Sequence, residues 1–179
     1  MKGSAEVSSF PSSQSKILTH DALANAVETR QRAGQRVVFT NGVFDLIHVG
    51  HVRYLEEARA LGDALIVAVN ADSSVKQFKG DLRPILSEDD RAELIASLAC
   101  VDYVTIFDTR TPVPLIEQVK PLIYVKGGDY KVEDLPEAVA VAAYGGEVRI
   151  LSLVGGKSTT NIIAKICRAY PNGADMDSK

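Results

Sequence analysis

Short runs rich in apolar and β-branched residues alternate along this chain with longer segments of helical periodicity. We expect strands at residues 36–40, 64–70, 102–107, 122–126 and 147–151. We expect helices at residues 19–33, 49–61, 72–77, 88–98, 111–119, 134–144 and 158–169. Strands joined by helices pair in parallel, and helices then cover both faces of the sheet. The alternation therefore predicts a single α/β domain, Rossmann-like and doubly wound, with a mainly parallel five-stranded sheet.

The two ends of the chain differ in composition from this pattern. Residues 1–15 are rich in serine, and residues 171–179 are short and polar. Such segments bury too little apolar surface to offset the entropy lost on ordering. We therefore expect a disordered segment over 1–15, the folded domain over 16–170 and a flexible tail over 171–179.

The composition excludes several classes of protein. The chain is 46% hydrophobic and 24% charged with a formal net charge of −3, which gives no electrostatic footprint for nucleic acid. No apolar run is long enough to cross a membrane, and the first residues lack the pattern of a secretory signal. The sequence has two cysteines, Cys100 and Cys167, which look unpaired and so fit a reducing compartment. We expect a cytoplasmic protein with no nucleic-acid or membrane partner.

The junction between the first strand and its helix carries most of the chemical information. Residues 40–51 read Thr-Asn-Gly-Val-Phe-Asp-Leu-Ile-His-Val-Gly-His, so that His48 and His51 are three residues apart at the first helical turn and share one face. Gly50 lets a ligand approach the backbone, and the helix N-terminus favours a phosphate. Two imidazoles add donors that can become cationic. The junction is therefore suited to binding a polyphosphate and stabilising charge during its transfer.

Other interpretations of the histidines remain open. A histidine near a helix start is most often a surface residue or a hydrogen-bonded core residue. A His-x-x-His pair can also hold zinc, but a typical zinc site needs a third and a fourth ligand, and His20 and both cysteines lie in other segments. We expect no metal held by protein side chains. Asp45 is expected to stabilise its loop through backbone hydrogen bonds rather than to act as a ligand.

Two further polar segments follow predicted strands, Lys126–Tyr130 after the fourth and 152–161 after the fifth. Ligands of parallel sheets bind beyond the carboxyl ends of the strands, so these segments should meet residues 40–51 in one crevice. The glycines of the first segment would let the backbone approach a nucleotide, and Asp129 could accept from ribose or base. Spacing alone favours a plain glycine turn with solvated charges.

The start of the last helix is open to two interpretations as well. Ser158 is a natural N-cap, which alone explains a hydroxyl there. The Gly-Lys-Ser string does not form a P-loop, because Leu151 stands where that motif needs its first glycine.

A run of basic residues, Lys76, Lys79, Arg83 and Arg91, lies around Gly80 and Pro84. Such a run is usually a solvated loop, and Arg91 can equally occupy an exposed helix position.

The junction matches the pattern Gly42-x-Phe44-Asp45-x-x-His48-x-Gly50-His51, which resembles the nucleotidyltransferase superfamily, in particular its cytidylyltransferase-like group. The resemblance covers roughly residues 16–170. Ser158-Thr159-Thr160 is similar to the second signature of the group, whose hydroxyls and helix N-terminus hold nucleotide phosphates. Lys157 and Asn161 stand where an apolar residue and an arginine are usual, so phosphate charge is expected to be met differently here.

Several stretches resemble most closely the D-glycero-β-D-manno-heptose 1-phosphate adenylyltransferases. They are Thr40–His51, Val69-Asn70-x-Asp72-x-x-Val75-Lys76, Arg83-Pro84-Ile85, Lys126–Tyr130 and Ser158-Thr159-Thr160. The resemblance implies transfer of AMP from ATP to a heptose 1-phosphate by in-line attack on the α-phosphate, giving ADP-heptose and pyrophosphate for bacterial surface polysaccharide. It also implies Mg²⁺ on the ATP, a separate sugar kinase in the pathway, and relatives that often pair as homodimers.

The same resemblance assigns roles to individual residues. The expected catalytic residues are His48, His51 and Lys79. The expected nucleotide-binding residues are Thr40, Asn41, Gly42, Phe44, Gly50, Lys126, Gly127, Asp129, Ser158 and Thr159. Arg83 and Arg91 are expected to bind the sugar phosphate, with Lys79 and Arg83 on a mobile loop that closes over the site.

Three alternatives stay open at this point. The same scaffold can transfer CMP to glycerol 3-phosphate or a similar small phosphate. The domain could instead bind a nucleotide without turning it over. A fragment of a class I aminoacyl-tRNA synthetase shares the histidine motif, but the length, the negative charge and the lack of a Lys-Met-Ser-Lys-Ser-like stretch make it remote.

Overall fold

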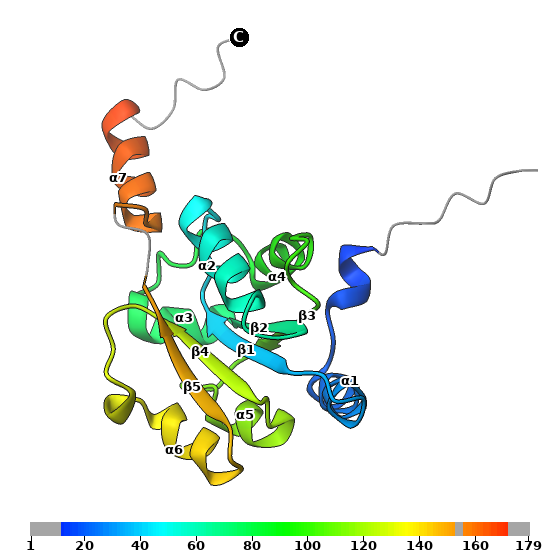
Figure 1. The fold of residues 1–179 in the computed structure, drawn as a ribbon. Helices are drawn as coiled ribbons and strands as arrows, with labels where there is room; N and C mark the ends of the chain where they lie inside the picture. The colour runs from blue at the N-terminus through cyan, green and yellow to red at the C-terminus, as the bar shows by residue number, and fades with distance from the viewer. Residues whose placement is uncertain (1–11, 153–155, 172–179) are drawn as a thin grey trace, which may run out of the picture.

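The apolar runs form one five-stranded parallel sheet in the computed structural model, which describes residues 12–152 and 156–171 (Figure 1). The strands are β1 (Val37–Gly42), β2 (Ala64–Asn70), β3 (Tyr103–Phe107), β4 (Ile123–Gly127) and β5 (Glu147–Leu151). The α-helices are α1 (His20–Arg32), α2 (Val49–Arg59), α3 (Asp72–Lys79), α4 (Glu88–Ala96), α5 (Val113–Val119), α6 (Pro136–Ala143) and α7 (Thr159–Ala169). The strand order is β3-β2-β1-β4-β5, and every pairing is parallel. The predicted fold class is confirmed, and the predicted element ends agree within two residues.

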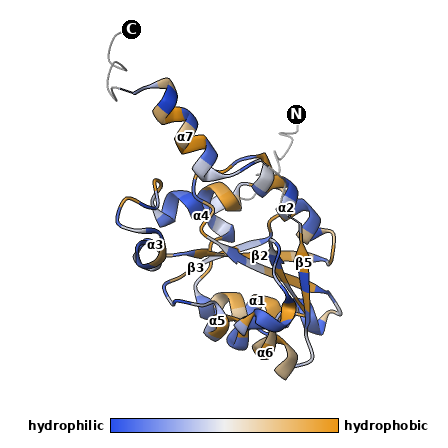
Figure 2. Cartoon of the chain, turned by 90° about the vertical axis from the view of Figure 1, so that its left-hand side faces the viewer, coloured by the Kyte–Doolittle hydropathy of each residue, from blue (hydrophilic) through white to orange (hydrophobic). Residues whose placement is uncertain are grey.

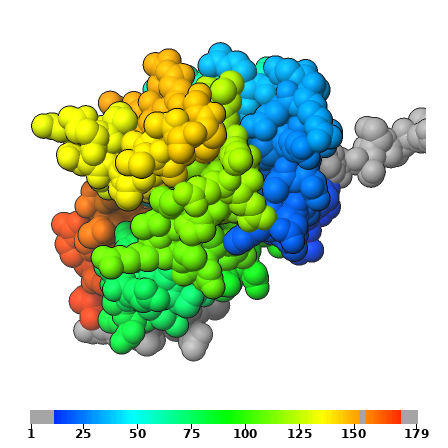
Figure 3. Space-filling view, turned by 90° about the horizontal axis from the view of Figure 1, so that it is seen from below, coloured from blue at the N-terminus to red at the C-terminus, as the bar shows by residue number. Residues whose placement is uncertain are grey.

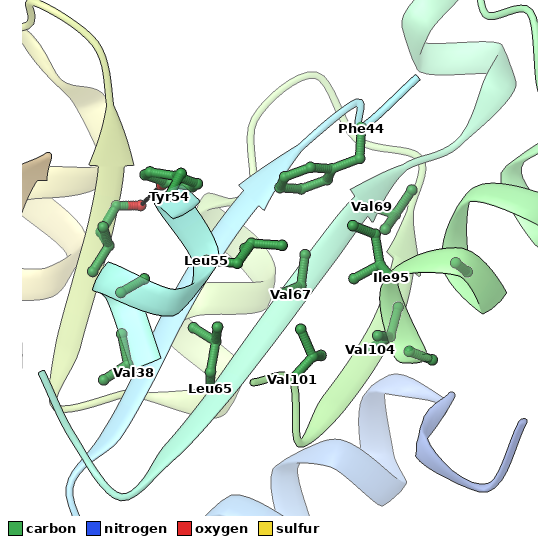
Figure 4. Packing of buried hydrophobic residues seen from close by; sticks show 14 of the residues in the cluster. Val38, Phe44, Tyr54, Leu55, Leu65, Val67, Val69, Ile95, Val101 and Val104 are labelled. Carbon is green, nitrogen blue, oxygen red and sulfur yellow. Dashed lines mark hydrogen bonds between the residues drawn. The ribbon is translucent and has the colours of Figure 1, made fainter. Parts of the chain in front are cut away.

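Helices cover both faces of the sheet because both faces are apolar. On one face α2 and α4 pack over residues such as Val38, Val67 and Val104, with Phe44 closing the cluster near the end of β1 (Figure 4). On the other face α1, α5 and α6 lie side by side, as Figure 3 shows from below. All seven residues of β2 are buried, as expected for a strand covered on both sides.

Two 3₁₀ turns, η1 (Ser13–Lys16) and η2 (Val132–Asp134), were not predicted. The first includes residues 13–15, which were predicted to be disordered, and its side chains find partners in the domain. Ser13 donates to Glu93 at 3.0 Å, and the Lys16 ammonium donates to the carbonyl of Val101 at 2.8 Å. Residues 1–11 and 172–179 lie outside the described part of the chain, so the predictions for them stay predictions.

The sheet reverses its winding between β1 and β4, and the carboxyl ends of these strands form the crevice where the polar segments meet. A buried hydrogen-bond cluster fixes α2 at this point. The hydroxyls of Thr40 and Tyr54 are 2.6 Å apart, and Thr40 also donates to the carbonyl of Val125 on β4 at 2.9 Å. The middle of α2 is therefore anchored to both strands of the switch point.

Arg91 on α4 is fully buried and holds the loops around the crevice together. Its guanidinium donates to the carbonyls of Val43, Asn70 and Leu86 at 2.6, 2.8 and 3.1 Å, and it forms an ion pair with Asp72. Because carbonyls from the end of β2 and from two loops converge on one cation, Arg91 ties these three segments together.

Replacing Arg91 with Met should lower the free energy of unfolding by about 3 kcal/mol, since three buried carbonyls lose their donor. Urea denaturation measures this loss. Arg53→Met, at an exposed position of α2, is the control and should change stability by less than about 0.5 kcal/mol. Equal stabilities for the two variants would contradict a structural role for Arg91.

Candidate active site

The two histidines stack at the start of α2. Their ring centroids are 3.9 Å apart and the ring planes differ by 18°. His48 is the N-cap, and its Nδ1 accepts from the backbone N–H of Gly50 at 3.1 Å. Because Nδ1 of His48 is an acceptor, the proton of the neutral ring must be on Nε2. The local backbone thus fixes which nitrogen of His48 is free to donate to a ligand.

Both histidines are held in the neutral form. Burial, followed by the repulsion that a protonated His48 would exert, lowers the pKa of His51 to about 4, although Asp45 acts in the opposite direction. Burial and the nearby Lys157 ammonium lower the pKa of His48. Among the described residues, the buried Nδ1 of His51 has no hydrogen-bond partner. The free site therefore offers neutral imidazole donors, and an anion bound beside them would favour their protonation.

Position 50 has room only for a glycine, because it lies between the ring of His48 and Lys157, just before α7. A Cβ placed there would lie 2.9 Å from the His48 ring and 3.2 Å from the Cβ of Lys157. Any side chain at this position must displace the imidazole that caps the helix.

The histidines line a cavity of about 220 Å³ between α2 and α7. Its other lining residues are Gly50, Lys79, Lys157, Ser158, Thr159 and Thr160. Two lysines and two helix N-termini give this cavity a positive character, since each N-terminus carries unpaired N–H groups. The α7 N-cap Ser158 accepts from the backbone N–H of Asn161 at 3.1 Å, as the capping interpretation predicted. The arrangement can hold a polyanion.

Asp45 joins the segments that form this cavity. Its carboxylate is 2% exposed and accepts from the backbone N–H groups of Ile85 and Leu86, with a closest distance of 3.0 Å, and from Arg83 at 2.8 Å. Its backbone carbonyl accepts from the hydroxyl of Thr159 on α7. Burial alone would raise the pKa of Asp45, but these hydrogen bonds and the Arg83 charge hold it below its usual range. Asp45 does bind backbone N–H groups, although on another loop rather than its own.

A second, smaller cavity of about 150 Å³ lies at the switch point of the sheet. It is lined by Asn41, Gly42, Val43, Phe44, His51, Tyr54, Lys126 and Gly127. His51 lines both cavities, so a group bound beside His51 can extend into either. Phe44 has a positive φ of 51° and places its ring edge against His51, with centroids 5.5 Å apart. A Cβ at Gly42 would lie 3.0 Å from that ring, which explains the glycine.

Four of the expected site residues line neither cavity. Thr40 and Arg91 are fully buried, with their polar groups bonded to protein. Arg83 is paired with Asp45, and Asp129 lies on the exposed turn after β4. Arg83 and Arg91 thus hold loops in place in this structure instead of facing a sugar phosphate.

Other lining residues were not expected in the site. Lys157 stood out in the sequence only as a departure from the family pattern, and its place beside His48 shows how the cavity gains a positive charge. Thr160 belongs to the quoted Ser-Thr-Thr string and could have been included. Val43 and Tyr54 carry no chemical signal that would have marked them.

The described residues contain no group of three or more His, Cys, Asp or Glu side chains that could hold a metal ion. In the same part of the chain, no helix combines the length and apolar character needed to cross a membrane.

Lowering the pH should destabilise the free protein through His51. In the unfolded chain this imidazole binds its proton near pH 6.5, but in the folded protein only near pH 4. Between these values the unfolded state holds more protons, so the free energy of unfolding falls as the pH falls. Between pH 7 and pH 5, the free energy of unfolding measured by urea titration should fall by on the order of 1 kcal/mol less in His51→Gln than in the wild type. Parallel losses in the two proteins would contradict a buried neutral His51.

Comparison with known proteins places this geometry in a family. A family model described as Cytidylyltransferase-like matches residues 39–165. The chain is 50% identical over 158 residues to the bifunctional protein HldE of Geobacter metallireducens, and 52% identical over 156 residues to HldE of Geotalea uraniireducens. These matches cover 88% and 87% of this chain but 32% of each relative, so the chain spans about a third of the length of these curated relatives.

A solved structure agrees with the sequence comparisons. The fold is similar to the crystal structure of the lipopolysaccharide core biosynthesis protein from Thermoplasma volcanium, with a TM-score of 0.57 and 32% identity over 68% of this chain and 98% of that one. The match of the family model includes both histidines and the start of α7, the elements that build the larger cavity. The chain belongs to the cytidylyltransferase-like family.

Proposed function

We propose that this chain transfers AMP from ATP to a heptose 1-phosphate, giving ADP-heptose and pyrophosphate. The observation that carries the proposal is the larger cavity, which is basic and is lined by the stacked histidine pair and the N-terminus of α7. The heptose acceptor is supported by the sequence stretches that resemble heptose 1-phosphate adenylyltransferases. The sequence identity of 50% and 52% to proteins named HldE supports it as well.

The reaction needs positioning and charge stabilisation more than proton transfer. The phosphate oxygen of the acceptor attacks the α-phosphorus of ATP in line, the bond to the bridging oxygen breaks, and pyrophosphate leaves. The attacking phosphate is already an anion at neutral pH, so no general base is required. His48 donates from Nε2 to the oxygens of the transferred phosphoryl group, and His51 is the second donor.

The leaving pyrophosphate is bound where the positive charge is concentrated. Lys79, Lys157 and the N-terminus of α7 with Ser158 and Thr159 line that end of the cavity. Gly50 lets the α-phosphate approach the backbone, and Asn41, Gly42, Phe44 and Gly127 bind the rest of the nucleotide or the adjoining acceptor from the smaller cavity.

Mg²⁺ is expected on the triphosphate, where it neutralises charge on the leaving group. The described residues offer no cluster of carboxylates for it, and the Asp45 carboxylate is already occupied by hydrogen-bond donors. The ion would therefore be held by phosphate oxygens and water, as Mg²⁺ bound with nucleotides often is.

The wider setting follows from the same proposal. Its acceptor is the product of a sugar kinase, so a separate kinase activity belongs to the same pathway. The proposed location is the cytoplasm, where ATP is available, and two copies of the chain are proposed to pair as a homodimer.

Pyrophosphate release tests the proposed reaction directly. The purified protein with Mg²⁺ should release pyrophosphate from ATP only when heptose 1-phosphate is present. Glycerol 3-phosphate and phosphoethanolamine, each offered with ATP and with CTP, are the controls. Release with CTP and one of these small phosphates would contradict the heptose acceptor but keep the chemistry. Nucleotide binding with no release from any pair would contradict catalysis.

His48→Ala and His51→Ala should each lower kcat by on the order of 10², the effect of removing one donor to a developing oxyanion. The matched control is His20→Ala, because His20 bonds the carbonyl of Ile106 and lines neither cavity. Its kcat should stay within about twofold of wild type, the range of a change far from the chemistry. Near-normal turnover in both cavity variants would overturn the assignment.

A further inference from the structure

A buried carboxylate lies behind the wall of the smaller cavity and has no role in the mechanism above. Glu137 in the first turn of α6 is 4% exposed. A carboxylate buried this deeply needs compensation from donors or positive charge. The helix N-terminus supplies part of it. The rest comes from the Lys126 ammonium, 3.0 Å from Oε1.

Tyr124 connects this ion pair to β1. Its hydroxyl lies 2.8 Å from Oδ1 of Asn41 and 3.2 Å from Oε1 of Glu137, and it accepts from Lys126 at 3.3 Å. Burial, strengthened by the negative charge of Glu137, raises the pKa of Tyr124, so the phenol stays protonated and acts as a donor. A hydroxyl has one proton, and the shorter contact directs it to Asn41. The ammonium is therefore the main donor to Glu137.

The network is incomplete on the side of Glu137. Within the described part of the chain, the buried Oε2 of Glu137 has no hydrogen-bond partner. An apolar side chain or a glutamine would fill this position at lower cost if only packing were needed, because an unpaired buried oxygen is unfavourable. The charge of this carboxylate therefore acts on a specific group, and the charged group that it contacts is Lys126.

Lys126 and Asn41 are the two members of this network that line the smaller cavity. Among the described residues that line this cavity, Lys126 is also the one cationic side chain, because His51 is neutral. In-line transfer requires the entering oxygen and the leaving pyrophosphate to lie on opposite sides of the phosphorus. With the leaving group in the larger cavity and the phosphorus beside His51, the smaller cavity is the space left for the entering phosphate.

We propose that Glu137 is a positioning residue that holds the Lys126 ammonium at the wall of the smaller cavity, where Lys126 binds the phosphate of the entering acceptor. This assigns Lys126 to the acceptor rather than to the nucleotide, and it rests on the proposed function. A lysine side chain is long and flexible, so a fixed carboxylate partner removes the entropy cost of ordering it when the substrate binds.

Glu137→Gln and Lys126→Met test the proposal, with Glu133→Gln on the exposed 3₁₀ turn η2 as the matched control. We expect kcat/KM for the acceptor to fall by about 10- to 100-fold in both variants, mainly through KM, as for a misplaced binding group. The KM for ATP should change by less than about threefold, and the double variant should be no worse than Lys126→Met alone. Glu133→Gln should match the wild type.

A purely structural role would give a different pattern. Equal losses for ATP and acceptor, additive losses in the double variant, or an unchanged acceptor KM in Lys126→Met would each overturn the proposal. If Glu137→Gln fails to fold, Lys126→Met still decides the outcome through the ratio of its two KM values.

The positioning role of Glu137 and the proposed function are tested by different measurements, so one can be contradicted without the other. The wild-type rate with heptose 1-phosphate tests the function. The positioning role is tested with whichever phosphate acceptor the wild type uses. Calorimetric binding of the same sugar or polyol phosphate to protein saturated with α,β-methylene-ATP gives a second measurement that needs no turnover. Unchanged acceptor affinity in Glu137→Gln would contradict the proposal.

Discussion

The buried carboxylate of Asp45 connects three segments that are far apart in the sequence. Its side chain binds the loop at residues 83–86, while its backbone carbonyl binds Thr159 at the start of α7. The α7 helix otherwise extends away from the sheet, and none of the residues that the structure describes in it is buried (Figure 2). The hydrogen bond to Asp45 therefore helps to hold the N-terminal end of α7 opposite the histidines, and the shape of the larger cavity depends on it.

Electrostatics in the site favour a neutral histidine pair until a ligand arrives. Burial and the surrounding positive charges oppose protonation of both rings, and the backbone N–H of Gly50 fixes the tautomer of His48. Neutral donors of fixed orientation stabilise developing charge without reorganisation. The positive charge of the cavity comes instead from lysines and helix N-termini.

The sequence predicted the sheet, the helices and the histidine pair, because each of these depends on local periodicity or spacing. It did not predict contacts between distant segments, such as Asp45 with Arg83 or Lys126 with Glu137, since the fold alone brings them together. Arg91 is an instructive case. The family resemblance assigned it to the sugar phosphate, and its charge was also compatible with an exposed helix position. It lies four residues before the buried Ile95, and the two residues share the inner face of α4. The complete burial of the Arg91 side chain shows that it has a structural role, and this burial could be seen only in the structure.

A crystal structure with Mg²⁺ and α,β-methylene-ATP tests the central claim most directly. The account predicts that the α-phosphate oxygens lie within hydrogen-bond distance of His48 and His51, with the β- and γ-phosphates at the N-terminus of α7 beside Lys79 and Lys157. A nucleotide bound elsewhere, or one whose phosphates contact neither histidine, would contradict it.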